Sequence, residues 1–459
     1  MLLCLTAPLF LQAQHLGNNN KRLDSLHKAR SASSVLRVST IVYNVTGGGT
    51  YCTGGSGMPV GLDGSEAGGS YQLQLNGVDI GAPIAGTGSA LSFGNQTAAG
   101  TYTVVGTVAG VSATMAGNVA IAINDVTPGV IATNQTICSG GDPAAFTIAT
   151  AATGSGTLSY QWQSSTNDCS TGFTDISGAT SATYDVPGGL ATTTYYRRIA
   201  TSTLNGVPCT ATSNCVTVTI NNISAGSINS DQTICNGGDP NVFTSTDATG
   251  LGTISYQWQS STTNCTTGFA DISGATSATY DVPAALAATT YYRRIATSTL
   301  NGVPCSATSN CVTVTVNAVT AGTIGSDQTI CNGGDPAAFT ITTAATGSGS
   351  ITYQWQSSTT DCTNGFANIS GATGATYDIP GGLATTTYYR RIATSTLNGV
   401  PCSATSNCVT VTINNATAGT IGSDQTICSG SDPSAFTSVV ATGSGTISYQ
   451  WQSSTTNCT

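Results

Sequence analysis

A repeat of almost one hundred residues constrains this chain more than any other feature of its sequence. The segment DQTICNGGDP begins at residue 231 and again at 327, with close copies at 134 and 424. Its cysteines are 97, 96 and 97 residues apart, at Cys138, Cys235, Cys331 and Cys428. We therefore divide this part of the chain into repeat 1 (126–222), repeat 2 (223–318), repeat 3 (319–415) and a truncated repeat 4 (416–459).

Hydrophobic alternation within each repeat indicates short β-strands. In YQWQ, Tyr160 and Trp162 occupy one face and the glutamines the other, while CVTVTI alternates aliphatic residues with threonine. Helical periodicity is absent from the sequence, so an all-β class is expected, and six or seven strands in about 96 residues favour a β-sandwich. The recurring tryptophans are the expected core aromatics: Trp162, Trp258, Trp355 and Trp451.

The segment TTTYYRRIATST reads as a further strand, and the Asn-Gly pair in the LNGV that follows suits a tight hairpin turn. We expect CVTVTI to be the partner strand in this hairpin. In repeat 1 the same alternation places Tyr196 and Arg198 on one face of the strand and Tyr195 and Arg197 on the other. The arginines are expected to stack on aromatic rings or to bond a loop aspartate rather than to bind a ligand.

Charge limits the functions open to the chain. Of its 459 residues 7% are charged and the net charge is −9, which argues against nucleic-acid or anionic-membrane binding. From Asp142 onward the sequence has no Lys, Glu or His. Serine and threonine there lack a base to activate them, and the recurring aspartates suit turns. We expect no catalytic residue, cofactor or metal ligand, with a structural Ca²⁺ at repeat junctions as the weaker alternative.

The N-terminus predicts export. MLLCLTAPLFLQAQ is typical of the apolar region and cleavage zone of a signal peptide, assigned to residues 1–14. A polar leader follows at 15–39, and then a module at 40–125 whose single cysteine, Cys52, is expected to be a free thiol. The expected location is extracellular or on the cell surface. Sixteen cysteines in an exported chain indicate disulfides, since no pair has the spacing of a zinc site.

Several sequence blocks carry a resemblance to a known family. TIC-x-GG-x-P, YQWQSS, DISGATSATYDVP, TTYYRR and LNGVPC followed by CVTVTV are similar to immunoglobulin-like repeats of very large surface and adhesin-like proteins of Bacteroidetes. The resemblance covers residues 126–459, and the module at 40–125 resembles another immunoglobulin-like module of such proteins. It implies tandem immunoglobulin-like β-sandwich domains, arranged as beads on a string. Such proteins typically carry a C-terminal sorting domain. This sequence stops partway through repeat 4, after the second of four expected cysteines, so we expect the chain to be a fragment.

The residues alone leave the disulfide pairing open among three connectivities per repeat. The resemblance implies that the first cysteine of a repeat pairs with the one after the Asn-Gly turn, which leaves the other two to pair. The expected disulfides are Cys138–Cys209, Cys169–Cys215, Cys235–Cys305, Cys265–Cys311, Cys331–Cys402 and Cys362–Cys408. Trp162 is then expected to pack against aliphatic side chains, since the YYRR strand has no cysteine to place behind it.

Two functions remain for such a chain. The first is a non-catalytic stalk or spacer of an adhesin, in which near-identical domains project a head away from the cell as an elongated monomer. The second is a glycan-binding or accessory region of a larger secreted hydrolase. Sugar recognition needs exposed rings, so burial of Tyr184, Tyr195 and Tyr196 would weaken the second. The expected partner is a surface ligand, a glycan or a protein of a host or neighbouring cell, with no nucleic acid and no membrane span.

Overall fold

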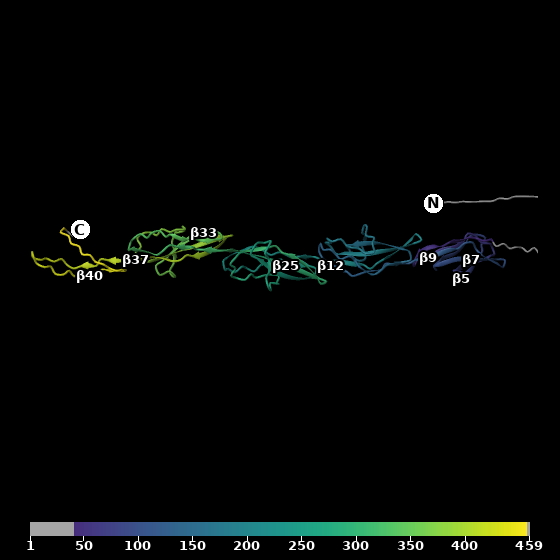
Figure 1. Ribbon diagram of the computed structural model, residues 1–459, viewed down its shortest axis with the longest axis horizontal. Coiled ribbons are helices and arrows are strands. Elements are labelled where there is room, and N and C mark those ends of the chain that lie inside the picture. The colour runs from purple at the N-terminus through teal and green to yellow at the C-terminus, as the bar shows by residue number, and fades with distance from the viewer. Residues whose placement is uncertain (1–40, 457–459) are drawn as a thin grey trace, which may run out of the picture. The chain divides into compact units, whose positions relative to one another are not determined.

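A computed structural model describes residues 41–456 of the chain, and all of its regular structure in that range is β-strand (Figure 1). The signal peptide at 1–14, the leader at 15–39 and Cys458 lie outside the described residues. The chain forms two compact units. Among the described residues, unit 1 comprises 41–126, Thr153–Leu158 and Thr201–Thr210, and unit 2 comprises the remainder. The hairpin end of repeat 1 thus belongs to the same unit as the module that precedes it.

The first module, in unit 1, contains two sheets. A three-stranded sheet has the order β1-β3-β6, and a six-stranded sheet has the order β2-β9-β7-β4-β5 with β8 beside β7. Its buried core includes Tyr71, Tyr102 and Val104. The strands are β1 (Val45–Gly47), β2 (Gly49–Cys52), β3 (Met58–Leu62), β4 (Ser70–Leu75), β5 (Val78–Ala85), β6 (Leu91–Gln96), β7 (Gly100–Val108), β8 (Val111–Thr114) and β9 (Val119–Asn124).

The three full repeats share eight strands in the same order; repeats 1 and 3 have one further pair of short strands, where repeat 2 has an isolated bridge between Ile228 and Ser245. Repeat 1 contains β10 (Val126–Thr127), β11 (Val130–Ile131), β12 (Gln135–Cys138), β13 (Ile148–Thr150), β14 (Thr153–Gly154), β15 (Thr157–Ser165), β16 (Thr174–Asp175), β17 (Thr194–Leu204), β18 (Val207–Thr212) and β19 (Val216–Asn221). Repeat 2 contains β20 (Ile223–Ser224), β21 (Gln232–Cys235), β22 (Thr249–Gly250), β23 (Thr253–Ser261), β24 (Ala270–Asp271), β25 (Thr290–Leu300), β26 (Val303–Thr308) and β27 (Val312–Asn317).

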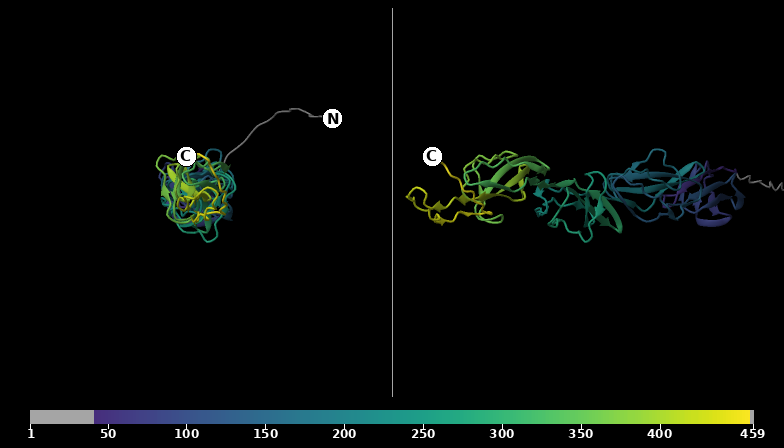
Figure 2. Two further views of the ribbon diagram at one scale, coloured as in Figure 1. Left: turned by 90° about the vertical axis from the view of Figure 1, so that its left-hand side faces the viewer. Right: turned by 60° about the vertical axis from the view of Figure 1, so that its left-hand side comes forward.

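Repeat 3 forms sheets of its own, drawn in green in Figure 2. It contains β28 (Val319–Thr320), β29 (Thr323–Ile324), β30 (Gln328–Cys331), β31 (Ile341–Thr343), β32 (Thr346–Gly347), β33 (Ser350–Ser358), β34 (Ala367–Asn368), β35 (Thr387–Leu397), β36 (Val400–Thr405) and β37 (Val409–Asn414). The described part of repeat 4 has four short strands, β38 (Ala416–Thr417), β39 (Thr420–Ile421), β40 (Ser438–Val439) and β41 (Thr442–Gly443).

Each full repeat is an immunoglobulin-like β-sandwich built on one large sheet. In repeat 2 the order is β21-β27-β25-β23-β24, with β26 beside β25. β21 runs parallel to β27 and places Cys235 opposite Asn317, whereas the other neighbours are antiparallel. The opposing layer consists of short strands and loops that bring Phe243, Ala275 and Val282 onto the core. The fold class agrees with the sequence prediction.

Aromatic rings fill the core. The Trp258 side chain is fully buried and stacks on Phe243, with ring centroids 5.8 Å apart. Tyr280 and Tyr292 pack around the same pair. Trp162 shares its core cluster with aliphatic side chains, as expected. The sequence analysis did not foresee the ring that stacks on it, which is Phe146 at 5.6 Å. Trp162 and Trp355 are fully buried, while Trp451 in the described part of repeat 4 is 61% exposed.

One arginine of each YYRR segment is buried among these rings without a carboxylate partner. Arg391 is 1% exposed, and its guanidinium carbon lies 4.5 Å from the Tyr353 ring centroid. It donates hydrogen bonds to the carbonyl oxygens of Ala375 and Ala321, at 2.6 and 2.7 Å. Arg198 and Arg294 make the equivalent contacts. The buried arginine thus ties the start of each repeat to a loop, and carbonyls take the place of the expected loop aspartate.

The Asn-Gly turn is a tight hairpin, but its partner strand differs from the one expected. Asn301 and Gly302 have φ values of 51° and 78°, which a turn with two left-handed residues requires. β25 enters this turn and β26 leaves it, with Leu300 opposite Val303. The CVTVTV strand β27 pairs with the first half of β25 instead. β25 is 11 residues long and therefore accommodates two partners along its length.

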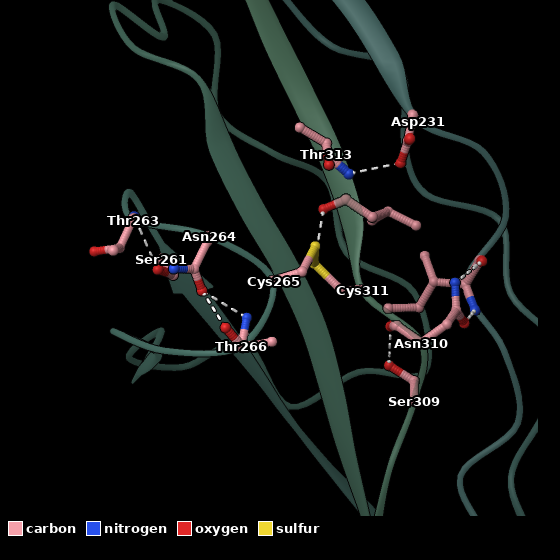
Figure 3. The surroundings of a disulfide bond; sticks show 12 residues. Asp231, Ser261, Thr263, Asn264, Cys265, Thr266, Ser309, Asn310, Cys311 and Thr313 are labelled. Carbon is pink, nitrogen blue, oxygen red and sulfur yellow. Dashed lines mark hydrogen bonds between the residues drawn. A yellow bond between two sulfur atoms is a disulfide. The ribbon is translucent and has the colours of Figure 1, made fainter.

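A short-range disulfide closes a loop within each full repeat. Figure 3 shows Cys265 joined to Cys311, which directly precedes β27. Asp231 lies nearby and accepts a 2.8 Å hydrogen bond from the backbone N–H of Thr313. The equivalent pairs are Cys169–Cys215 and Cys362–Cys408. These three disulfides have the pairing that the sequence analysis expected.

The buried tyrosines generate a pH prediction. Burial raises the pKa of Tyr196, Tyr292 and Tyr389 to about 12. Their unfolded pKa is about 10, so between pH 10 and 12 the unfolded chain loses these protons while the folded chain retains them. The free energy of unfolding should therefore fall as the pH rises through this window.

Phenolate absorbance during alkaline titration, recorded beside circular dichroism, measures both effects. The three tyrosines with a pKa of about 12 should titrate last in the native chain, and Tyr292→Phe should remove one of them. Titration of every tyrosine near pH 10 while the β-sheet signal persists would contradict the assignment.

Candidate functional site at the junctions between domains

The long-range disulfides join consecutive domains rather than closing single repeats. The structure pairs Cys52 with Cys209, Cys138 with Cys305, and Cys235 with Cys402, each with a Cα–Cα distance of 5.5 Å. The expected pairs Cys138–Cys209, Cys235–Cys305 and Cys331–Cys402 are wrong. Cys52 is also not the free thiol expected, whereas Cys331 and Cys428 are free and exposed.

The geometry of a single sheet explains this correction. In repeat 2, Cys235 lies beside Asn317 at one end of β27, and Cys305 lies beside Ser298 in the hairpin. Tyr292 pairs with Val312, so the two sites are separated by six residues of β25 and five of β27. Eleven residues of strand span about 36 Å, whereas a disulfide needs Cα atoms within about 7 Å. Each repeat therefore presents its two cysteines at opposite ends.

A buried asparagine lies beside each of these disulfides. Asn221, the last residue of β19, is fully buried. Its side-chain amide donates to the carbonyl oxygens of Ser298 and Val303 in the next repeat, at 2.7 and 3.0 Å. The Ser298 hydroxyl donates to Asn221 Oδ1 at 2.8 Å and accepts from the Gly252 N–H at 3.0 Å. One side chain thus satisfies the polar groups of the hairpin it contacts.

The same contacts recur at every junction between a described domain and a full repeat. Asn124 and Asn317 are also fully buried. Asn124 bonds Ser202 and Val207, and Asn317 bonds Ser395 and Val400, at 2.7 to 2.9 Å. The turn asparagine adds a further contact, since Asn301 donates to Thr136 Oγ1 at 3.0 Å. Asn205 and Thr50, and Asn398 and Thr233, repeat it. We call this set of contacts the hairpin lock.

The hairpin lock has no titratable group, so it holds domains together without offering acid or base chemistry. Elsewhere, backbone N–H groups of Ser170 and Thr171 lower the pKa of Asp168 to about 2. Asp361 has the same value, because the N–H groups of Asn364 and Thr363 bond it. Asn264 makes these turn contacts in repeat 2, which indicates a structural role rather than an ionic one.

Residues 41–456 contain no cluster of three or more His, Cys, Asp or Glu side chains placed to hold a metal ion. Within that range no helix is long and apolar enough to cross a membrane.

The repeats match the model of one known protein family. The model of the family described as Domain of unknown function (DUF8696) matches residues 127–222, 224–318, 320–415 and 417–459. The chain belongs to this family. Its four matches follow the four repeats, each starting within a residue or two of a repeat boundary derived from the cysteine spacing. A search of curated proteins finds no match to the sequence.

The chain is similar to solved structures with several immunoglobulin domains. The three N-terminal domains of the bacteriophage RB49 highly immunogenic outer capsid protein are 12% identical, covering 60% of this chain and 99% of that one, with a TM-score of 0.30. Titin I67–I69 is 10% identical, covering 60% and 97%, at 0.33. The four N-terminal domains of Dscam1 isoform 6.9 are 13% identical, covering 81% and 98%, at 0.23. At these scores the likenesses carry no inference about function.

The hairpin lock predicts a local effect of one substitution. Asn221→Ala removes two donors and one acceptor from a buried site and should destabilise the docked hairpin by about 2 kcal/mol. Hydrogen exchange of the amides in β26 and at Gly252 should accelerate by roughly 30-fold. Asn222→Ala, at the exposed neighbouring position, is the matched control and should leave exchange unchanged. Equal protection in the two variants would show that Asn221 does not hold the hairpin.

Proposed function

We propose that this chain is a non-catalytic, tension-bearing stalk or spacer of a secreted bacterial surface protein of the adhesin type. The observation that carries this proposal is how much of the chain its long-range disulfides bridge. The loops closed by Cys52–Cys209, Cys138–Cys305 and Cys235–Cys402 each overlap the next one and together include every residue from 52 to 402. Folded domains connected only by a linker would need no such arrangement.

These disulfides matter under tension because the shortest covalent route between two points limits how far the chain can be extended. Cys52 and Cys402 are 350 residues apart along the backbone. Through the disulfides the route passes from Cys52 to Cys209, along the backbone to Cys235, and across to Cys402. Only the 26 residues from 209 to 235 can then be extended, about 90 Å of chain compared with roughly 1,200 Å for the full length. The unfolding of any domain would release almost no length.

The surface and the location fit this role. Six disulfides are typical of an oxidising compartment outside the cytosol. Export through the segment at 1–14 and an origin among Bacteroidetes surface proteins belong to the proposal. We propose a surface ligand of a host or neighbouring cell as the partner of the whole protein, and no ligand for the repeats themselves. The repeats contain no His, Lys or Glu, so we propose no catalytic role for them either.

The glycan-binding alternative receives less support. Tyr196 is 3% exposed, and Tyr184 lies 5.6 Å from the buried Trp162 ring, so both rings belong to the core. Tyr195 is half-buried. These three side chains therefore provide no exposed ring platform for a sugar.

Single-molecule stretching of the full chain tests the stalk proposal. The contour length between Cys52 and Cys402 should be about 90 Å in the oxidised chain and roughly 1,200 Å after reduction. A variant with Cys52→Ser and Cys209→Ser is left with a route through Cys138–Cys305. Its shortest route then contains the 86 residues from 52 to 138, the 6 from 305 to 311 and, across Cys265–Cys311, the 30 from 265 back to 235, about 420 Å of chain.

The matched control is Cys138→Ser with Cys305→Ser, which removes one disulfide but leaves the shortest route unchanged. Its release should equal that of the oxidised parent. A parent that extends by roughly 1,200 Å without reduction, or two double variants that extend equally, would rule out the tension-bearing role.

A further inference from the structure

The end of repeat 3 has the asparagine, threonine and cysteine that contact the hairpin at the other junctions, and among residues 41–456 no hairpin contacts them. Asn414 ends β37 as Asn221 ends β19, and Cys331 ends β30 opposite it. The three earlier asparagines are fully buried, whereas Asn414 is exposed. Thr329 and Cys331 are likewise exposed, and the Cys331 thiol is free.

Half of the junction is nevertheless in place. The Ser444 hydroxyl accepts from the Asn415 N–H, and the Ser444 N–H bonds the Asn415 carbonyl. Ser348 and Ala318 make the same pair of contacts at the preceding junction. The segment beyond repeat 3 is therefore positioned as in a complete junction.

A cavity of about 240 Å³ lies beside this segment, lined by Asn414 and Gly445 among others. Gly445 is the counterpart of Gly252 and Gly349, whose N–H groups donate to the hairpin serine at the complete junctions. The cavity is thus bounded by groups that elsewhere bond Ser298 and Ser395. The position of the cavity matches the position that the hairpin occupies at the other junctions.

We infer that this face, formed by Thr329, Cys331, Asn414 and Gly445, is a docking site for an LNGVPC-type hairpin. The asparagine would bind the hairpin carbonyls, and Cys331 would form a disulfide with the hairpin cysteine. The bond forms by thiol–disulfide exchange, in which the Cys331 thiolate attacks a disulfide of the incoming cysteine and expels the other thiolate. Cys331 is therefore an attachment point rather than a spare thiol, and this inference stands independently of the stalk proposal.

The full oxidised chain supplies its own control for this inference. Cys428 is also free and exposed in the same TIC sequence context, but the residues described around it include no strand equivalent to β37 and no counterpart of Asn414. The probe is a backbone-cyclised peptide with the sequence of residues 393–404, ATSTLNGVPCSA, activated as a mixed disulfide at its cysteine. A scrambled peptide of the same composition is the reference.

The hairpin peptide should react with Cys331 about tenfold faster than with Cys428, as measured by mass-spectrometric mapping, since the lock adds hydrogen bonds at only one of the two thiols. The scrambled peptide should react equally with both. Asn414→Ala, a change at an exposed position, should abolish the preference while leaving the reaction with the scrambled peptide unchanged. Lack of preference for Cys331, or a preference that survives in Asn414→Ala or with the scrambled peptide, would overturn the inference.

Discussion

The structure depends on the distance between the two cysteine-bearing ends of each large sheet. Parallel pairing of β21 with β27 sets Cys235 at one end, and the long β25 carries the hairpin with Cys305 to the other. Disulfide geometry does not permit a bond across that length. Each cysteine is therefore available only to a neighbouring domain, and the repeat acts as a connector with an acceptor at one end and a hairpin at the other.

The asparagine gives each connection its register. A disulfide alone leaves rotation about several bonds, whereas the Asn221 amide must satisfy two carbonyls and one hydroxyl of the hairpin simultaneously. Buried polar groups are costly when unpaired, so only one arrangement of hairpin and strand end is favourable. The buried arginine acts similarly within a repeat, since its carbonyl partners fix the loop around the tryptophan. Polar contacts thus specify geometry in a chain that has few charges.

The sequence was sufficient for the fold but not for the junction. Alternation in YQWQ and CVTVTI correctly placed Trp162 and Val218 inside, because period-2 burial is a local property. Pairing of Cys138 depended on the register of β12 against β19, which no local pattern encodes. A signal was nevertheless present: an asparagine closes the last strand of the first module and of each full repeat, at 124, 221, 317 and 414. A polar residue repeated at the end of a buried strand indicates a partner beyond the domain.

The central claim is that covalent bonds join consecutive domains, and non-reducing peptide mapping of the oxidised chain tests it most directly. The account predicts a fragment in which the peptide containing Cys138 is linked to the one containing Cys305, with Cys52 linked to Cys209 and Cys235 to Cys402. Recovery of Cys138 linked to Cys209, within one repeat, would contradict it.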